Sequence, residues 1–313
     1  MLLAVHYAQP PEWRWYILAY FVLAGLAGGS YALGTLLRLW GRSWDEQAAR
    51  LCFLIALPLT IVCPLLLTLD LGHPLRFWHM LIDTGVAGPA LNFKYWSPMS
   101  LGAWGLLVFG VFALVTFLEV VALDGRYPYP GNRFVARLLS GQTGRVVNVV
   151  GTVFALFVAG YTGVLLAVSN EPMWSDSYAL GGLFLISGLS GAAALVTLCT
   201  RWRLGAEASD DVLGDADRYF AVLEVAFLIV LFVTLGFAGQ LGRALALPWT
   251  VLWAIAVLSL VAPLAGRLGG GIVMGSGGTA AIERARVSAT AVAIVVLVGV
   301  VALRAAVLWS AQG

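Results

Sequence analysis

Eight long apolar stretches divide this sequence, and they constrain its fold more than any other feature. A helix needs about 20 apolar residues to cross the hydrocarbon core of a membrane. Because 61% of the residues are hydrophobic and only 11% are charged, little sequence is left for a soluble domain. We therefore expect an all-α polytopic membrane protein with eight transmembrane helices, the first of them a membrane helix and not a cleaved signal peptide. The predicted spans are residues 16–37, 51–69, 95–118, 146–168, 179–199, 219–241, 244–265 and 287–303.

The distribution of Lys and Arg among the loops predicts the orientation of these spans. The loops after the first, third, fifth and seventh spans carry 13 of the 18 Lys and Arg residues. Because Lys and Arg accumulate in cytoplasmic loops, both termini and the 70–97 loop should lie outside the cytoplasm. The other five basic residues are assigned to the outer side: Arg14, Arg76, Lys94, Arg243 and Arg304. The net charge of +2 then reflects topology, and it gives no reason to expect a nucleic-acid partner.

The first and fifth spans resemble each other. At one constant offset, the matching pairs are Phe21 with Phe184, Gly25 with Gly188, and Gly28 with Gly191. Four spans separate the two copies, so both copies have the same orientation. This pattern favours two four-helix bundles in parallel repeat, comprising residues 1–170 (with the outer loop 70–97) and residues 171–313. A chance match between small-residue packing motifs is the alternative.

Several cofactors are not expected in this chain. None of the three histidines lies inside a span, so paired axial ligands for a b-type haem are missing. The three cysteines have no CxxC spacing, which predicts buried thiols and no iron–sulfur cluster or other metal site. Any redox chemistry would therefore depend on a partner subunit or on a diffusible carrier.

Three polar residues are predicted to gather in the outer layer of the membrane. At a rise of 1.5 Å per residue, Tyr20 and Tyr161 lie roughly 10 Å below the outer surface, and Asp70 lies at that surface. A phenol that donates to a carbonyl, beside a carboxylate that relays protons, suits a quinone head group. The alternatives are tyrosines of the interfacial aromatic belt and an Asp70 that caps its helix.

Two acidic residues are candidates for a proton path. Glu224 lies inside the sixth span, and Glu119 lies near the cytoplasmic end of the third. A carboxylate inside a span is often functional because burying its charge is expensive. The alternative for each is a paired or snorkelling acid near the cytoplasmic interface.

The segment 70–104 is the most distinctive connection in the chain. It lies between two long apolar spans and still carries charge, histidine, proline and many aromatic residues. This composition predicts a docking surface at the outer edge of the membrane.

The sequence DLGHPLRF at residues 70–77, followed by SPMSLGAW at residues 97–104, resembles the NrfD-like family, the family of the membrane subunit of polysulfide reductase. Members usually have Arg where this chain has His73. The first span and the Tyr161–Thr–Gly163 stretch also resemble this family, and the likeness extends over essentially the whole chain.

This resemblance implies an integral subunit without a redox cofactor of its own. It implies an iron–sulfur subunit docked on the outer face and a molybdopterin catalytic subunit beyond it. It also implies that Tyr161 contacts quinone, with Gly163 beside it, and that Asp70 belongs to the proton route. Polysulfide reductase has Asn and His on the first span, and Ile17 and Tyr20 stand at the corresponding positions here.

Together these features predict a subunit of the bacterial cytoplasmic membrane that exchanges electrons between a quinone (menaquinone or ubiquinone) and an external iron–sulfur partner. His73 and Arg76 would help to dock that partner or to stabilise charge, together with Trp78, His79 and Lys94. A secondary transporter and a passive membrane anchor are the two alternatives.

Overall fold

The chain is almost entirely helical. The computed structural model describes residues 13–84, 88, 90–124, 132–139, 141–200, 203, 205–270 and 279–312. Within these ranges the side chains at 132, 133, 138, 207, 265–270 and 279–288 are not described. In the described part of the chain, seven helices are long and apolar enough to cross a membrane. The protein is therefore an all-α polytopic membrane protein.

Eight long helices follow one another along the chain. They are α1 (Trp15–Trp40), α2 (Glu46–Asp70), α3 (Pro98–Asp124), α5 (Gln142–Ala167), α7 (Ala179–Cys199), α8 (Asp210–Phe237), α10 (Trp249–Gly270) and α11 (Thr279–Ser310). The shorter elements are η1 (Ser43–Asp45), η2 (Pro74–Met80), α4 (Asn132–Leu138), α6 (Pro172–Ser175), η4 (Ala206–Ser209) and α9 (Leu241–Ala244), together with the antiparallel strands β1 (Ile82–Asp83) and β2 (Ala90–Leu91).

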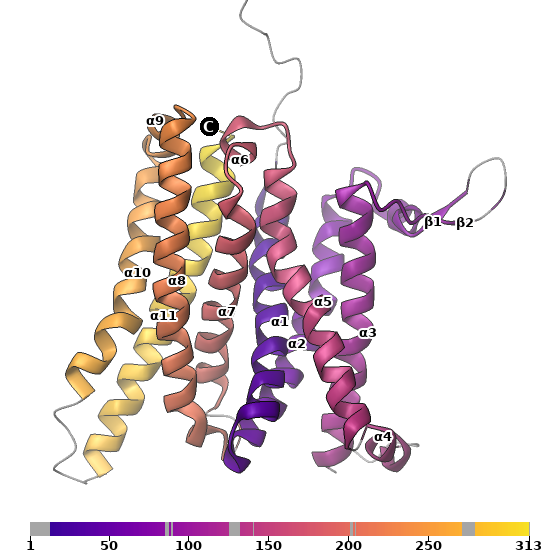
Figure 1. The fold of residues 1–313 in the computed structure, drawn as a ribbon, viewed down its shortest axis with the longest axis vertical. Helices are drawn as coiled ribbons and strands as arrows, with labels where there is room; N and C mark the ends of the chain where they lie inside the picture. Colours follow the sequence, from indigo (N-terminus) through magenta and orange to yellow (C-terminus); the bar gives the residue numbers. More distant parts are fainter. Residues whose placement is uncertain are drawn as a thin grey trace, which may run out of the picture.

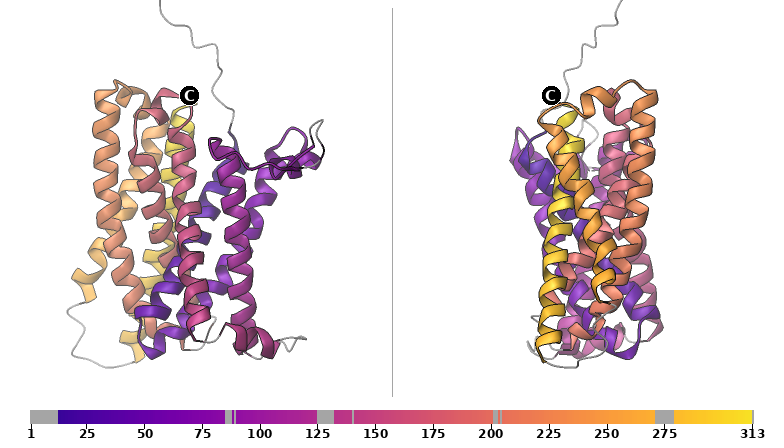
Figure 2. Two further views of the ribbon diagram at one scale, coloured as in Figure 1. Left: turned by 45° about the vertical axis from the view of Figure 1, so that its right-hand side comes forward. Right: turned by 90° about the vertical axis from the view of Figure 1, so that its left-hand side faces the viewer.

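The helices lie side by side along one common direction (Figures 1 and 2). α1 packs against α2, α5 and α7, while α7 also packs against α8 and α11. η2 and the β1–β2 hairpin project sideways from one end of this bundle, which we call the hairpin end. The opposite end carries α4, and we call it the α4 end.

Both ends of the described chain lie at the hairpin end. Trp13 accepts a hydrogen bond through its carbonyl from the Gln312 side chain, at 3.3 Å. The Trp15 and Trp309 rings pack edge to face, with their centroids 4.6 Å apart. The first and last long helices are thereby tied together at the same end of the bundle.

One helix begins well before the residue that hydropathy predicts. Hydropathy starts the sixth span at residue 219, but α8 begins at Asp210. Two acids, Asp210 and Asp211, occupy its first turn, where they interact favourably with the positive end of the helix dipole. As a consequence Asp217 lies inside the helix and is buried. The predicted start of the sixth span at residue 219 was therefore too late to include Asp217.

The predicted seventh span corresponds to α10. Its apolar part within the described residues, Trp249–Leu264, is shorter than the seven candidate spans. The presence of eight membrane-spanning helices therefore stays a prediction.

A glycine contact joins α1 to α7. A Cβ atom on Gly188 would lie 3.0 Å from the Cα atom of Gly25, and one on Gly25 would lie 3.3 Å from the Cα atom of Gly188. A Cβ on Gly29 would likewise overlap the Gly188 carbonyl group. Small residues let helix backbones approach this closely in a membrane. The two spans that resemble each other in sequence therefore contact each other at equivalent positions.

Arg304 is buried inside the bundle and does not belong to an outer loop. Its side chain is fully buried in α11. Its guanidinium group donates to the Phe184 carbonyl at 3.0 Å, to the Phe21 carbonyl at 3.3 Å and to the Ser187 hydroxyl at 2.8 Å. The last span therefore extends through Arg304 toward Trp309, which was the alternative to its predicted end at residue 303, and Arg304 is a helix residue six positions before Ser310.

Ion pairs fasten the helices together at the α4 end. Arg38 of α1 bridges to Glu119 of α3 at 3.0 Å and to Glu46 of α2 at 3.3 Å. Asp124 at the end of α3 accepts from Arg50 of α2 and from Arg203 beyond α7. Part of the predicted basic side is thereby balanced by local acids.

Candidate functional site

A cavity of about 570 Å³ opens at the hairpin end and extends between α1, α2, α3 and α5. Along α3 its lining runs as far as Leu114, sixteen residues beyond Pro98, so it extends to a depth of about 24 Å. Its walls are mostly aliphatic and aromatic. Ligand pockets typically have volumes of about 300–1,000 Å³ with few polar groups, and this cavity fits that description.

The cavity brings together four of the residues predicted to contact quinone or its protons. Ile17 and Tyr20 come from α1, Asp70 from the end of α2 and Tyr161 from α5. Two threonines also line the wall, but each donates its hydroxyl to a carbonyl of its own helix, Thr60 to Ala56 and Thr68 to Pro64. The oxygen-bearing side chains best placed to meet a ligand are thus the two phenols and the carboxylate.

Tyr161 is held in place by the start of α3. Its hydroxyl donates to the carbonyl of Pro98, and its ring stacks on Phe157 with centroids 5.4 Å apart. A Cβ atom on Gly102 would overlap the Tyr161 ring, so only glycine leaves room for it there. Because the Tyr161 proton is donated to Pro98, its oxygen presents a lone pair to an incoming hydroxyl donor.

The SPMSLGAW segment explains this geometry. Pro98 begins α3 and supplies the carbonyl that orients Tyr161, and Gly102 supplies the space for its ring. Ser100 accepts from the Lys94 backbone N–H at 3.0 Å and donates to the Asn92 carbonyl at 3.2 Å, which folds the incoming loop over the helix start. Sequence reasoning did not assign a role to Pro98 or Gly102, because their function depends on a residue of α5.

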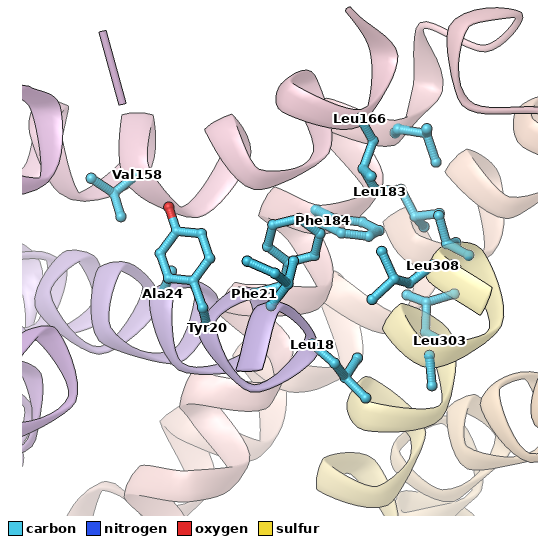
Figure 3. Close-up of a cluster of buried hydrophobic side chains, with 14 of the residues drawn as sticks. Leu18, Tyr20, Phe21, Ala24, Val158, Leu166, Leu183, Phe184, Leu303 and Leu308 are labelled. Carbon is cyan, nitrogen blue, oxygen red and sulfur yellow. The ribbon is translucent and has the colours of Figure 1, made fainter. Parts of the chain in front are cut away.

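Tyr20 presents a second phenol to the cavity. Its side chain is buried, and Figure 3 shows the ring with its hydroxyl directed toward α5, where Val158 lies. The hydroxyl has no hydrogen-bond partner among the residues that the structure describes. A buried hydroxyl in this situation is available to donate to a ligand carbonyl.

Asp70 lies at the mouth of the cavity. It is the last residue of α2 and is exposed. A carboxylate at a helix C-terminus meets the negative end of the helix dipole, which is unfavourable for folding stability. Arg14, just before α1, is the cation that acts on it electrostatically. This position gives Asp70 access both to the cavity and to the medium.

Gly163 does not line the cavity. A Cβ atom there would overlap the carbonyl group of Leu180, so this glycine allows α5 and α7 to approach each other. Its predicted place beside the quinone is not supported by this position.

Glu224 lies elsewhere, in a buried polar cluster between α7, α8 and α11. It is 3% exposed, and the Ser187 hydroxyl bonds to both its carboxylate and the Arg304 guanidinium. Its Oε2 atom has no hydrogen-bond partner within the described residues. Two helical turns away on α8, Asp217 accepts from Ser190 at 2.6 Å. The alternative of an exposed snorkelling acid does not apply to Glu224.

Glu119 is also remote from the cavity, at the α4 end. Its carboxylate accepts from Arg38 at 3.0 Å, and the two side chains are 9% and 14% exposed. It is therefore a paired acid, which was the alternative considered from the sequence.

The predicted docking residues lie on the hairpin-end loop. His73 and Arg76 are exposed at η2, and the Trp78 and His79 rings stack with centroids 3.8 Å apart. Arg76, His79 and Lys94 line a second hollow of about 310 Å³. Leu71, Met80 and Met99 line both this hollow and the large cavity, so the two adjoin.

The loop also exposes large apolar side chains. Leu75 is 88% exposed, Leu91 75% and Tyr95 71%. Such a concentration at one edge of the bundle is typical of a surface that contacts a partner or lipid head groups.

Comparison with known proteins gives consistent results. The family model described as "Polysulphide reductase, NrfD" matches residues 5–313. A polysulfide reductase polypeptide of Wolinella succinogenes is 28% identical over 242 residues, covering 72% of this sequence and 71% of that protein. Protein NrfD of Escherichia coli is 25% identical over 276 residues, covering 80% and 83%. A selenate reductase subunit of Mesobacillus selenatarsenatis is 24% identical over 248 residues, covering 71% of this sequence and 54% of that protein.

Proposed function

The chain belongs to the NrfD polysulphide reductase family of oxidoreductase membrane subunits, and on that premise we propose that it is the quinone-reactive subunit of its complex. In this proposal, menaquinone or ubiquinone binds in the large cavity and exchanges electrons with an iron–sulfur subunit at the hairpin end. That subunit in turn serves a molybdopterin catalytic subunit. In this proposal the redox clusters belong to the partner subunits, and this chain supplies the quinone site.

The main support for the proposal is that Tyr20, Asp70 and Tyr161 line the same apolar cavity. The aliphatic walls suit an isoprenoid tail, and the polar groups suit a ring with two oxygen atoms. The Tyr161 oxygen can accept from a quinol hydroxyl, while Tyr20 can donate to a quinone carbonyl. The two phenols therefore bind the reduced and oxidised forms with opposite hydrogen-bond polarity.

Asp70 handles the protons in this proposal. Oxidation of a quinol gives up two electrons and two protons, and reduction takes up the same number. An exposed carboxylate at the mouth can take a proton from the ring and pass it to the medium. Tyr20 lies five residues beyond Trp15, about 8 Å along α1, so the ring need not enter deeply to reach it.

The hairpin-end loop is the proposed docking surface for the iron–sulfur subunit. His73, Arg76 and Lys94 supply positive charge, and Trp78 and His79 supply a stacked apolar surface. Complementary charge steers association and fixes the register of a complex. Docking here brings a partner's cluster close to the cavity mouth.

The same proposal fixes the topology. The hairpin end faces the outside of a bacterial cytoplasmic membrane, and the α4 end faces the cytoplasm, as the distribution of Lys and Arg favours. Eight spans then form two four-helix units, residues 1–170 and residues 171–313, with both termini outside. The Gly25–Gly188 contact supports this division.

Glu224 is proposed as a member of a cytoplasmic proton path in the second unit. Its burial beside Ser187, Arg304 and Asp217 supports this role, because an acid inside the membrane is costly to retain. Unchanged proton uptake in Glu224→Gln with normal quinol turnover would rule this path out.

The test of quinone chemistry is turnover by the purified complex. We expect Tyr161→Phe and Tyr20→Phe to lower quinol oxidation or quinone reduction while the complex stays assembled. Tyr178→Phe, at a 93% exposed position, is the matched control and should leave turnover unchanged. Full activity in the assembled Tyr161→Phe and Tyr20→Phe complexes would contradict the proposal and favour a passive anchor.

A further inference from the structure

A line of buried polar side chains occupies the α4-end half of the first four long helices. It contains the buried side chains of Tyr31 and Thr35 of α1, Thr116 of α3 and Asn148 of α5, together with the half-buried Thr152 of α5. Nothing in the proposed quinone chemistry uses these residues. Polar groups at this depth are expensive unless they have partners, so their presence on three neighbouring helices needs an explanation.

Hydrogen bonds connect these side chains to one another. Thr152 donates to the Thr35 hydroxyl at 2.8 Å and shares its hydrogen with the Asn148 carbonyl, also at 2.8 Å. Thr35 in turn donates to the carbonyl of Tyr31 at 3.2 Å. The Tyr31 hydroxyl donates to the Val147 carbonyl of α5 at 3.5 Å and lies beside the Thr116 hydroxyl of α3. The side chains therefore form one network between three helices.

The network contains buried polar atoms without protein partners. Within the described residues, both the nitrogen and the oxygen of the Asn148 side-chain amide have no hydrogen-bond partner. Asn148 is 1% exposed. A buried polar atom without a hydrogen-bond partner destabilises the folded protein. Water is the ligand that can satisfy the donor and the acceptor of one amide together.

One end of the network reaches the α4 end. The Arg38–Glu119 ion pair lies there, with Glu119 one helical turn from Thr116 and Arg38 one turn from Thr35. These two groups are the charged side chains that face the network from α1 and α3.

The other end meets the inner end of the large cavity. Tyr31 lies sixteen residues beyond Trp15, about 24 Å along α1, which is the same depth as Leu114 of the cavity wall. The Tyr31 ring packs edge to face on Phe109, the residue before Gly110, which also lines the cavity. Gly151 is needed here because a Cβ atom would overlap the Tyr31 hydroxyl.

We propose that Tyr31, Thr35, Thr116, Asn148 and Thr152 line a hydrated channel that carries protons between the α4 end and the inner end of the cavity. The hydroxyls donate and accept, so a proton can enter at one side of the line while another leaves at the other. Asn148 does not titrate and holds the water molecules in place. The proton-carrying role rests on the proposed quinone function, whereas the hydration of the channel does not.

Hydration is tested by the accessibility of single cysteines. In a complex whose native Cys52, Cys63 and Cys199 are replaced by Ala, Asn148→Cys is exposed to Ag⁺ from one side of sealed vesicles at a time. Protection from later alkylation in denaturant measures the reaction. Ala155→Cys, two helical turns away on α5 at a fully buried apolar position, is the matched control.

We expect Ag⁺ to protect Asn148→Cys rapidly from the α4 side, to protect it slowly from the hairpin side, and to protect Ala155→Cys slowly from both. Equal, slow protection of the two cysteines would overturn the channel. The accessibility measurement does not depend on quinone turnover. It therefore tests the hydration of the channel even if the quinone proposal is wrong.

Proton transport is tested with Asn148→Leu in proteoliposomes. We expect slower proton exchange at the α4 side, with the part carried by the proposed Glu224 path remaining, and slower quinol turnover. Thr197→Val, which removes a buried hydroxyl on α7 that donates to a carbonyl of its own helix, should leave both unchanged. Normal proton exchange per electron in Asn148→Leu would overturn the transport role even if Asn148→Cys is accessible. If Tyr161→Phe retains full turnover, the quinone proposal fails on its own account.

Discussion

Gly25 and Gly188 touch backbone to backbone, although 163 residues separate them in sequence. They occupy equivalent positions in the two copies of one sequence pattern. In the proposed arrangement of two parallel four-helix units, this contact would lie at the two-fold axis that relates them. This contact explains why α1 and α7 lie at the centre of the bundle (Figure 1).

We predict that Gly188→Val destabilises the protein. The added side chain would meet the α1 backbone, and overpacking of this kind costs about 1–3 kcal/mol. Thermal unfolding of the detergent-solubilised complex measures the effect. Gly236→Val on α8 is the control, because a Cβ atom there meets nothing within 4 Å. An equal, small effect of both substitutions would show that the contact is not tight.

Gly102→Ala should impair quinol oxidation without disturbing assembly. The new methyl group would push the Tyr161 ring out of its place, and a small misplacement at a reacting group costs about 10–100-fold in rate. Steady-state turnover over a range of quinol concentrations checks this. Gly110→Ala is the paired control, since it lines the same cavity and a Cβ there lies 3.8 Å from Thr60. Wild-type kinetics in Gly102→Ala would separate Tyr161 from the chemistry.

Arg304→Met should destabilise the protein more than any exposed substitution. Arg304 and Glu224 interact electrostatically without a direct ion pair. Removing one of two interacting buried charges leaves the other uncompensated, at a cost of up to about 3–5 kcal/mol. The expected loss is visible in thermal unfolding, and Glu224→Gln in the same protein should restore part of the stability. Arg243→Met removes a half-exposed pair with Glu171 and should cost little. An Arg304→Met protein as stable as the wild type would mean that Glu224 does not depend on it.

Asp70→Asn should slow turnover while leaving quinol binding intact. The amide keeps the shape of the carboxylate but cannot take a proton, and loss of a general base typically costs about 100-fold or more. Rapid-mixing measurements of electron transfer and proton release would report the change. Asp83→Asn on the hairpin is the control, as it is exposed and does not line the cavity. Proton release at the wild-type rate in Asp70→Asn would remove Asp70 from the proposed route.

Charge reversal at Arg76 and Lys94 should weaken binding of the partner subunit. Rim charges act mainly on the association rate, and the effect should grow at low ionic strength because salt screens it. Binding of the purified partner to the immobilised membrane protein measures this. Arg145→Glu, exposed at the α4 end, is the control. Equal weakening by Arg145→Glu would indicate a non-specific charge effect.

The arrangement of Tyr20, Asp70 and Tyr161 could be predicted from the sequence because hydropathy fixes where a span begins and helical rise fixes depth. Three residues at similar depth on neighbouring helices are expected to lie close together. Their rotation about the helix axes was not available from the pattern, and this is why Gly163 was placed beside the cavity although it faces α7.

The buried charges could not be predicted in the same way. Hydropathy ends a span at the first charged residue, so it places Arg304 at the end of the last helix and Asp217 in a loop. Their cost is offset by groups on other helices, such as the Phe184 carbonyl and the Ser190 hydroxyl. The hydropathy of one segment gives no information about hydrogen-bond partners on other helices.

The burial of Arg304 also has a consequence for biosynthesis. An Arg inside an isolated helix opposes membrane insertion, at a cost of up to about 2.5–3.5 kcal/mol when it lies at the helix centre. The carbonyls that receive this guanidinium belong to α1 and α7, which are made before α11. The last long helix therefore becomes stable in the bilayer only when the earlier ones have already come together. A protein whose first half misassembles would leave Arg304 facing lipid, and such a helix is a natural target for membrane proteases.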